Sequence, residues 1–550
     1  MTTRREKSDG RTVPEGRRKA VPTPTSAGGG KATTASEEVS QLRLFSETAD
    51  SPRGAVPGTG RGRSRPPAQY AVPKSENACD PDSPAMTMEK VASVGNLRRA
   101  FERVESNDGA PGPDRQSVRE VREQLEQLLP ALRCALLDGS YYPGMIRRVW
   151  IPKAGGGERG LGIPNVVDRV VQQAMHQVLS PHYEPMFHPS SHGFRPGRSC
   201  HTAITEAGRH LKEGHEWVVD LDLEKFFDRV HHDRLMARLA QRIADRRLLR
   251  LIRQMLTAKV VMPDGVVVTT EEGTPQGGPL SPLLSNIVLD ELDWELERRG
   301  HRFVRYADDS NVYVRSERAG LRVMAAIVRF IERRLRLKVN AAKSAVARPE
   351  NRHFVGFRLR RNWEAAEIEV LPSKRSLDRM ATKIRKLTPR TWGRSAADCI
   401  SRANAYFRGW IGFFGICSDT PEVVRALHGF DAHLRRRLRA LLLRQWKRKR
   451  FIARRLIRMG SRPATVWRVV YGGRKSLWAL SHCGPVDYAM DKNYFAQRGL
   501  LSLEVLYRGQ PRFVIAQEQL TLDLESCGRK RRRRNKGLSS PTPCVPKSRM

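Results

Sequence analysis

The chain has 550 residues, enough for roughly two to four domains, and its 99 Lys and Arg outnumber 58 Asp and Glu, giving a formal net charge of +41. This excess predicts a polyanionic partner, because cationic side chains bind phosphates by releasing their counterions. No apolar run approaches the roughly 18 residues of a bilayer-spanning helix. The N-terminal MTTRREKSDGRTVPEG also lacks the apolar segment of a signal peptide. We therefore expect an intracellular nucleic-acid-binding protein with no membrane partner.

The eight cysteines include no C-x-x-C pair, which argues against a zinc ribbon or a disulfide framework and favours reduced thiols. Residues 1–85 are rich in Pro, Gly, Ser, Thr and Arg, and residues 506–550 include the run GRKRRRRNKG. Such compositions cannot bury a core, so both ends are predicted to be disordered basic tails.

Strands and helices alternate in the region after the N-terminal tail. Apolar residues at helical spacing predict a helix over 94–104. Two β-rich segments, 147–153 and 159–164, flank the glycine turn AGGGE and predict a hairpin. A helical period follows over 165–180, and EWVVDLDLEKFF at 216–227 reads as a strand leading into a helix.

The segment SPLLSNIVLDELDWELERRG predicts a helix with Ser281 as N-cap, Pro282 at the first helical position and Gly300 at the C-terminal stop. Interleaved strands and helices of this kind predict a mixed α/β or α+β core. From about residue 385 the pattern is helical only. One apolar stripe there comprises Ile400, Ala403, Phe407, Trp410, Ile411 and Phe414.

A strongly basic stretch follows. Residues 435–458 contain twelve Lys or Arg and no acid, interleaved with leucines. A solvated helix face usually mixes charges of both signs, so we favour a phosphate-binding face over an ordinary exposed surface. The candidate nucleic-acid-binding residues in this stretch are Arg435, Arg436, Arg437, Arg444, Lys447 and Arg448.

Two adjacent carboxylates, Asp308 and Asp309, interrupt the β-forming run VRYADDSNVYV. Neighbouring strand residues point to opposite faces, so both acids can serve one site only where the backbone turns. We predict a β-hairpin with the acids at its tip, although Asp is also common in plain surface turns. Concentrated negative charge needs a cation, and Mg²⁺ prefers carboxylate and phosphate oxygens.

A third carboxylate lies in VVDLDLEKFFD, at the end of another apolar run. Two metal ions held by three carboxylates can activate a 3′-hydroxyl and stabilise a leaving pyrophosphate. Asp222 and Asp220 are both candidates for the third ligand, and spacing alone does not choose between them.

Eight segments occur in a consistent order over roughly 92–360: LRRAFERVESNDGAPGPD, RRVWIPKAGGGERGLGIP, SSHGFRPGRSCHTA, VVDLDLEKFFDRVHHDRL, GTPQGGPLSPLLSNIVLDELD, RYADDSNVYV, LKVNAAKS and HFVGF. Jointly they resemble the group II intron-encoded reverse transcriptases, or maturases. The later segments ANAYFRGWIGFF and LRRRLRALLLRQWKR resemble the thumb or maturase domain of that family.

The resemblance implies a right-hand polymerase fold of the α+β class. Fingers and palm, with an antiparallel sheet, would occupy 86–365, and an all-α thumb or maturase domain 366–505. The implied activity is RNA-directed DNA synthesis with Mg²⁺ and deoxynucleoside triphosphates. The implied partners are the intron RNA, whose splicing the protein would assist, and the DNA target and primer used in retrohoming. A bacterial cytoplasmic, nucleoid-associated location follows from that role.

The resemblance also assigns residues. It implies that Asp222, rather than Asp220, joins Asp308 and Asp309 at the catalytic metal site, with Leu223 beside it. The dNTP-binding candidates are Lys153, Arg159, Phe227 and Gln276, with the Phe227 ring excluding a 2′-hydroxyl. The candidates for template or primer contact are Arg195, Arg198, Gly277, Gly278, Asn340 and Lys343.

Two departures from the family pattern stand out. Gly160 follows the fingers arginine where the family usually has proline. No paired cysteines follow residue 500, so we expect no HNH endonuclease and a primer from another source, such as a replication fork.

The tail peptide QLRLF resembles motifs that bind the bacterial sliding clamp. Gln41, Leu42, Leu44 and Phe45 would then contact the clamp, unless they form a chance apolar cluster.

Three functions remain open at this point. The first is an intron-encoded reverse transcriptase that also assists splicing. The second is an RNA-binding splicing cofactor without polymerase activity, and the third is a non-intron reverse transcriptase of the defence type. The clustered acids argue against the second, and the thumb-like segment against the third.

Overall fold

The computed structural model describes residues 86–152, 157–389, 393–473 and 476–510. The predictions for residues 1–85 and 511–550, for Lys153 and for Gln41, Leu42, Leu44 and Phe45 therefore lie outside the described residues. The expected start of the C-terminal tail at residue 506 is wrong, because α20 continues to Arg508 and buries Tyr507.

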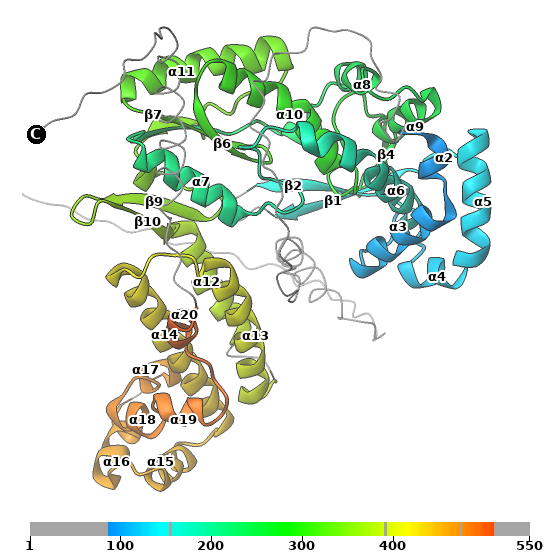
Figure 1. The fold of residues 1–550 in the computed structure, drawn as a ribbon. Helices are drawn as coiled ribbons and strands as arrows, with labels where there is room; N and C mark the ends of the chain where they lie inside the picture. The colour runs from blue at the N-terminus through cyan, green and yellow to red at the C-terminus, as the bar shows by residue number, and fades with distance from the viewer. Residues whose placement is uncertain (1–85, 153–156, 390–392, 474–475, 511–550) are drawn as a thin grey trace, which may run out of the picture. The chain divides into compact units, whose positions relative to one another are not determined.

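The strands form three sheets (Figure 1). The first has the order β2-β1-β4-β5, made of β1 (Ile146–Pro152), β2 (Glu158–Ile163), β4 (Val260–Val261) and β5 (Val267–Val268). The second is antiparallel with the order β6-β7-β3-β8, made of β3 (Trp217–Leu221), β6 (Arg302–Tyr306), β7 (Asp309–Val314) and β8 (Ala345–Ala347). The third is the hairpin of β9 (Phe357–Asn362) and β10 (Glu367–Pro372).

Helices surround the first two sheets and make up the later part of the chain. The α-helices before β8 are α2 (Met88–Val91), α3 (Val94–Ser106), α4 (Val118–Glu123), α5 (Leu125–Asp138), α6 (Val166–Tyr183), α7 (Cys200–Lys212), α8 (His232–Ala240), α9 (Arg246–Leu256), α10 (Ser281–Arg298) and α11 (Glu317–Phe330). Short 3-10 or π segments are η1 (Glu184–Met186), η2 (Phe226–Asp228), η3 (Ile331–Leu335) and η4 (Pro349–Asn351). The later α-helices are α12 (Lys374–Leu387), α13 (Ala396–Phe414), α14 (Pro421–Gln445), α15 (Lys449–Arg458), α16 (Pro463–Tyr471), α17 (Leu477–Leu480), α18 (Gly484–Ala489), α19 (Lys492–Ala496) and α20 (Leu503–Arg508).

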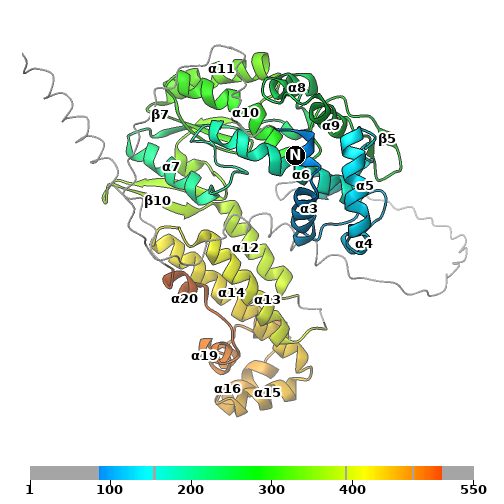
Figure 2. The ribbon, with the colours of Figure 1, turned by 45° about the vertical axis from the view of Figure 1, so that its right-hand side comes forward.

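The antiparallel sheet of β6, β7, β3 and β8 separates two hydrophobic cores. Alternate residues of a strand face opposite sides, and Val219 and Val312 belong to one core while Val218 and Tyr313 belong to the other. Helices α10 and α11 contribute to the first core and α7 to the second. Figures 1 and 2 show α11 and α7 on opposite sides of the sheet. The sheet is therefore covered on both faces, and its strand ends carry the polar residues.

The predicted α+β class is confirmed. Strand β3 follows the prediction, but the segment after it forms only the short η2 before α8 begins at His232. The expected N-cap of α10 is wrong by one residue: Leu280 is the cap, and the Ser281 hydroxyl donates to the Pro275 carbonyl oxygen at 2.7 Å instead. Because the Ser281 hydroxyl is hydrogen-bonded to the preceding loop, it does not cap the N-terminus of α10.

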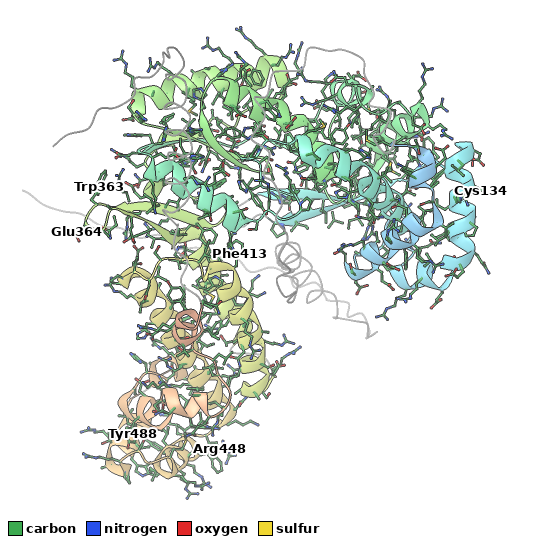
Figure 3. All side chains as sticks on the ribbon, in the orientation of Figure 1. Cys134, Trp363, Glu364, Phe413, Arg448 and Tyr488 are labelled. Atoms are coloured by element: carbon green, nitrogen blue, oxygen red, sulfur yellow. The ribbon has the colours of Figure 1, made fainter. Side chains whose placement is uncertain are left out.

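The purely helical part begins at Lys374, earlier than the expected residue 385. The last strand before it, β10, ends at Pro372. The apolar stripe of α13 is buried at Phe407 and Ile411, as predicted. The boundary expected between the palm and the thumb, at 365/366, falls in the turn between β9 and β10. Figure 3 labels Trp363 and Glu364 in this turn. Among the described residues, no helix is both long and apolar enough to cross a bilayer.

Candidate active site

The hairpin that carries the paired aspartates has a two-residue turn. Tyr306 pairs with Asp309, so that Ala307 and Asp308 form the connection between β6 and β7. Ala307 has a φ of 56°, a left-handed conformation that is uncommon for a residue with a Cβ. The acids therefore lie at the tip of a hairpin, as the sequence predicted.

Strand pairing brings Asp222 to the same place. Leu221, the last residue of β3, pairs with Ser310 in the antiparallel register of β3 and β7, so the residue that follows the strand, Asp222, comes opposite Asp309. Residues directly opposite each other in an antiparallel pair point to the same face. Asp222 and Asp309 are thus neighbours although 87 positions separate them.

Asp220 lies two residues earlier on the same face but is already neutralised. Arg352 donates to its carboxylate through Nε at 2.8 Å and to the Lys343 carbonyl oxygen at 2.6 Å. This arginine is a functional candidate that the sequence analysis missed, because nothing in its local sequence marks it. The structure favours Asp222 over Asp220 as the third carboxylate of the site.

The carboxylates raise one another's pKa. The Asp309 side chain remains accessible to solvent, yet desolvation by the surrounding protein raises its pKa, and the negative charges of Asp308, Asp220 and Asp222 add to the effect. The resulting pKa of Asp309 is about 7. Desolvation likewise raises the pKa of Asp308, and Arg159 opposes that shift. Repulsion of this kind is relieved when a cation binds.

The donors at this site suit Mg²⁺, which prefers carboxylate oxygens. Within the described ranges, however, no three acidic, histidine or cysteine side chains converge as a preformed metal cage. The Lys343 ammonium lies 3.5 Å from Asp222 Oδ2 and provides positive charge there. The Leu223 side chain is buried in the core, so only its backbone could contribute to a metal site.

The segment LKVNAAKS supports Asp222 from the side. The Asn340 backbone amide donates to the Asp222 carbonyl oxygen at 2.8 Å, and the Asp222 amide donates to Ser344 Oγ at 3.0 Å. Asn340 and Lys343, predicted to lie near the primer, are therefore adjacent to Asp222, one of the predicted catalytic carboxylates.

A buried arginine anchors the turn between β6 and β7. Arg305 is fully buried, and its Nε donates to Asp293 Oδ1 at 2.8 Å. Its remaining donors reach Asn286 Oδ1 at 3.0 Å, Ser191 Oγ at 2.7 Å and the Ala307 carbonyl oxygen at 2.9 Å. The turn that precedes Asp308 is thus tied to α10 by a satisfied ion pair, which local sequence did not reveal.

The loop HGFRPGRS packs against the same turn. A Cβ on Gly193 would lie 2.2 Å from the Ala307 nitrogen, so only glycine allows this approach. Arg195 is 7% exposed and donates to the Glu184 carboxylate at 2.9 Å and to three backbone carbonyl oxygens. The prediction that Arg195 contacts template phosphates is therefore wrong, because its donors are used inside the protein. Arg198 is half-buried and donates to the Pro189 carbonyl oxygen.

The loop of Gln276, Gly277 and Gly278 contacts the fingers hairpin. The Gly162 amide donates to the Gln276 carbonyl oxygen at 2.7 Å. A Cβ on Gly277, whose φ is +124°, would lie 2.5 Å from the Gly162 carbonyl oxygen, and one on Gly278 would meet the side chain of Gln172. We expected these glycines to contact the template or the nucleotide, and this needs correction. The groups that approach them closely belong to the protein itself, at Gly162 and Gln172.

Phe227 lies in η2 and is half-buried, with its ring edge-on to Phe226 at 5.2 Å. Arg159 is exposed on β2 and acts electrostatically on Asp308. A Cβ at Gly160 would lie 2.6 Å from the Arg148 guanidinium carbon, so a larger residue cannot fit there without displacing Arg148. This gives a local reason for glycine where the family usually has proline.

The basic residues of α14 and α15 divide between the core and the surface. Arg444, Lys447 and Arg448 are exposed, and Figure 3 labels Arg448 in the C-terminal helical region. Arg437 is 9% exposed and donates to the Thr388 carbonyl oxygen at 2.6 Å, so its predicted role in nucleic-acid binding is wrong. Arg435 and Arg436 are half-buried and line a cleft.

Comparisons with known proteins agree with this geometry. Residues 151–359 match the family described as reverse transcriptase (RNA-dependent DNA polymerase), and residues 377–460 match the group II intron, maturase-specific domain. Protein YkfC of Escherichia coli K12 is 42% identical over 200 residues, which are 35% of this chain and 52% of that protein.

The group II intron-encoded protein LtrA of Lactococcus lactis subsp. cremoris is 40% identical over 172 residues, 31% of this chain and 28% of that protein. The chain thus spans about half or less of the length of these relatives. A solved structure, the partial Cas6-RT-Cas1–Cas2 complex, is 23% identical with a TM-score of 0.30 and covers 44% of this chain and 42% of that chain. That similarity is too low to carry an argument.

The ion pair of Arg305 and Asp293 predicts a large effect on stability. Arg305→Met leaves the Asp293 carboxylate buried without its partner, and we expect the free energy of unfolding to fall by about 3–5 kcal/mol. Chemical denaturation measures the change. Arg302→Met, on the same strand with its side chain 61% exposed, should change stability by less than about 1 kcal/mol. Equal effects of the two substitutions would contradict the anchoring role of Arg305.

Asp290, one turn before Asp293 on α10, predicts a pH effect. Burial, followed by the charge of Asp293, raises its pKa from 3.8 to about 6. The native state therefore keeps this proton where the unfolded state has lost it, and stability is lost as pH rises from about 4 to 6. As the pH rises between these values, the free energy of unfolding of Asp290→Asn should increase by about 2–3 kcal/mol relative to that of the parent. A difference in unfolding free energy that does not vary with pH would contradict this assignment.

Proposed function

This chain belongs to the group II intron-encoded reverse transcriptase and maturase family, and we propose that it copies RNA into DNA at the carboxylates Asp222, Asp308 and Asp309. The observation that carries the proposal is the strand register that sets Asp222 opposite Asp309 at the tip of the β6–β7 hairpin. These residues lie within the range 151–359 that matches the reverse transcriptases.

In the proposed reaction, a primer 3′-hydroxyl attacks the α-phosphate of a deoxynucleoside triphosphate, a new P–O bond forms, and pyrophosphate leaves. Mg²⁺ held by the three carboxylates would activate the hydroxyl and stabilise the charge that develops on the leaving group. The chain itself holds the carboxylates together at their strand ends, with Lys343 adjacent. Arg159 could bind the incoming triphosphate from β2. The Phe227 ring would exclude a ribonucleotide by contact with its 2′-hydroxyl.

The second half of the proposal is RNA binding. Arg444, Lys447 and Arg448 are exposed near the junction of α14 and α15, within the match to the maturase-specific domain. Cations on one surface bind RNA by counterion release. We infer that this surface binds the intron RNA, assists its splicing and brings it to a DNA target where cDNA synthesis is primed. The bacterial nucleoid is the corresponding location. The comparisons give no support to a sliding-clamp partner.

Two alternatives are less well supported. A splicing cofactor without polymerase activity would not need crowded carboxylates in a site where desolvation, followed by their mutual repulsion, raises the pKa of Asp309 to about 7. A defence-type reverse transcriptase would not explain the match of residues 377–460 to the maturase-specific domain.

Replacing two carboxylates tests the polymerase proposal. The double variant Asp308→Asn, Asp309→Asn removes the charge that would hold Mg²⁺, and primer extension on an RNA template should fall at least about a thousandfold. RNA binding should persist, because the exposed cations are unchanged. Asp264→Asn, an exposed acid in the β4–β5 turn, is the matched control and should extend primers normally. Normal synthesis by the double variant would refute the proposal.

The role of the Phe227 ring is tested by nucleotide selection. Phe227→Ala removes the group that would clash with a 2′-hydroxyl, so the discrimination ratio for dNTP over rNTP should fall by about tenfold or more. Single-nucleotide incorporation with each substrate measures it. Phe226→Ala is a contrasting change, since Phe226 is buried in the core and should lower stability without lowering discrimination. An unaltered ratio in Phe227→Ala would rule out the gate.

A further inference from the structure

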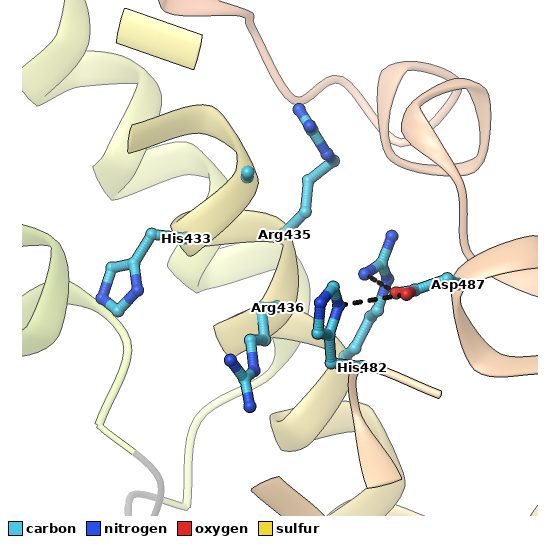
Figure 4. A pocket seen from close by; sticks show the side chains of 7 residues that line it. His433, Arg435, Arg436, His482 and Asp487 are labelled. Atoms are coloured by element: carbon cyan, nitrogen blue, oxygen red, sulfur yellow. Dashed lines mark hydrogen bonds and ion pairs between the residues drawn. The ribbon is translucent and has the colours of Figure 1, made fainter. Parts of the chain in front are cut away.

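Two clefts adjoin each other on the helical part of the chain. The first, of about 370 Å³, is lined by Ala432, His433, Arg435, Arg436, Arg439, His482 and Asp487 (Figure 4). We call it the cationic cleft. The second, of about 350 Å³, is lined by Ala381, Arg385, Ala426, Gly429, Phe430 and His433, and we call it the apolar cleft. His433 lines both clefts, so they can be filled by two parts of one ligand.

The cationic cleft has positive charge beyond what its own acid neutralises. Asp487 pairs with Arg439 and, at 3.0 Å, with Nδ1 of His482. Arg435 has no hydrogen-bond acceptor among the described residues. The Arg436 guanidinium stacks on the Trp478 ring at 4.1 Å and donates through Nη2 to the Trp478 carbonyl oxygen at 3.4 Å, while its Nε is buried without a hydrogen-bond partner in that same part of the chain. The Arg435 guanidinium and the remaining Nη1 of Arg436 are therefore left to bind an anion, and planar guanidiniums suit phosphate oxygens.

The apolar cleft lies beside this anion site, and Arg385 is the one side chain in its lining that is always charged. A Cβ built on Gly429 of α14 meets nothing within 4 Å, so the helix surface is open at this point. Phe430 is half-buried on one side, and the His433 ring stands between the clefts, edge-on to Trp478 at 6.2 Å. Burial and the neighbouring arginines lower the pKa of His433, which favours a neutral ring. A neutral ring and an apolar wall suit a nucleobase.

We propose that one unpaired nucleotide of the bound RNA occupies these clefts, with its phosphate in the cationic cleft and its base in the apolar cleft. Both volumes lie near the lower end of the range for small-ligand sites, about 300–1,000 Å³. The base must be unstacked to enter, so an unpaired RNA segment fits and a duplex does not. RNA is favoured over DNA because residues 432–439 lie within the match to the maturase-specific domain. The inference rests on the RNA binding proposed above and names the contact that it uses.

A space-filling substitution tests the apolar half. Gly429→Leu occupies the cleft and replaces glycine inside a helix with a better helix former, so the fold should be retained. The probe is a fluorescent single-stranded oligouridylate RNA, and its affinity for the full chain should fall by about tenfold, the effect of losing one stacked base. The matched control is Gly409→Leu in α13, another exposed helical glycine with no atom within 4 Å of its Cβ position, which should bind like the parent.

A charge substitution tests the cationic half. Arg435→Gln and Arg436→Gln should each weaken binding of the same RNA by about five- to tenfold and lower the salt dependence of its affinity. Arg425→Gln removes an exposed arginine elsewhere on α14 and should have a smaller effect on both quantities.

The outcomes separate the possibilities. Loss of affinity with Gly429→Leu but not Gly409→Leu, for single-stranded RNA but not duplex RNA, supports the site. Binding by Gly429→Leu equal to the parent overturns it, and so does an equal loss for duplex RNA or for single-stranded DNA. Primer extension by the parent is measured separately. Its absence would overturn the proposed polymerase, whereas loss of the cleft effect with normal extension would overturn only this site.

Discussion

The buried ion pair between Arg305 and Asp293 is the constraint on which the candidate active site depends. It connects the end of β6 to α10 and, through the Ala307 carbonyl oxygen, holds the turn that presents Asp308. A buried pair adds little net stability, because both charges must be desolvated. Its value here is geometric, since it holds a turn in which Ala307 is left-handed and Gly193 approaches the backbone closely.

Negative charge is concentrated at this turn in a chain that is strongly basic overall. Arg352 neutralises Asp220, and Lys343 lies beside Asp222, yet the pKa of Asp309 remains raised to about 7. The site therefore has an unmet demand for positive charge. This demand suits the proposed reaction, in which metal ions would bind at the carboxylates.

The cationic side chains of the helical part lie in three kinds of environment that composition cannot distinguish. Arg437 and Arg439 are buried and bond backbone carbonyl oxygens, so they connect helices to one another. Arg435 and Arg436 line a cleft, and Arg448 is exposed. A single basic stretch of sequence thus provides packing residues, the lining of a cleft and exposed cations that we propose bind phosphates, depending on where each residue lies on α14 or at its junction with α15.

The sequence by itself determined the local features: the β6–β7 hairpin, the acids at its tip, the helix stripe that buries Phe407 and the order of the motifs. Each of these depends on neighbours in the chain, through turn chemistry or the period of apolar residues. Tertiary structure alone decided that Asp220 belongs to Arg352, that Arg195 and Arg437 are internal, and that Gly277 approaches Gly162 rather than a substrate. It also brought Arg436 to Trp478, forming a cleft from segments about 40 residues apart. These partners are distant in the chain, and the pattern of one segment carries no information about which residue of another will be packed against it.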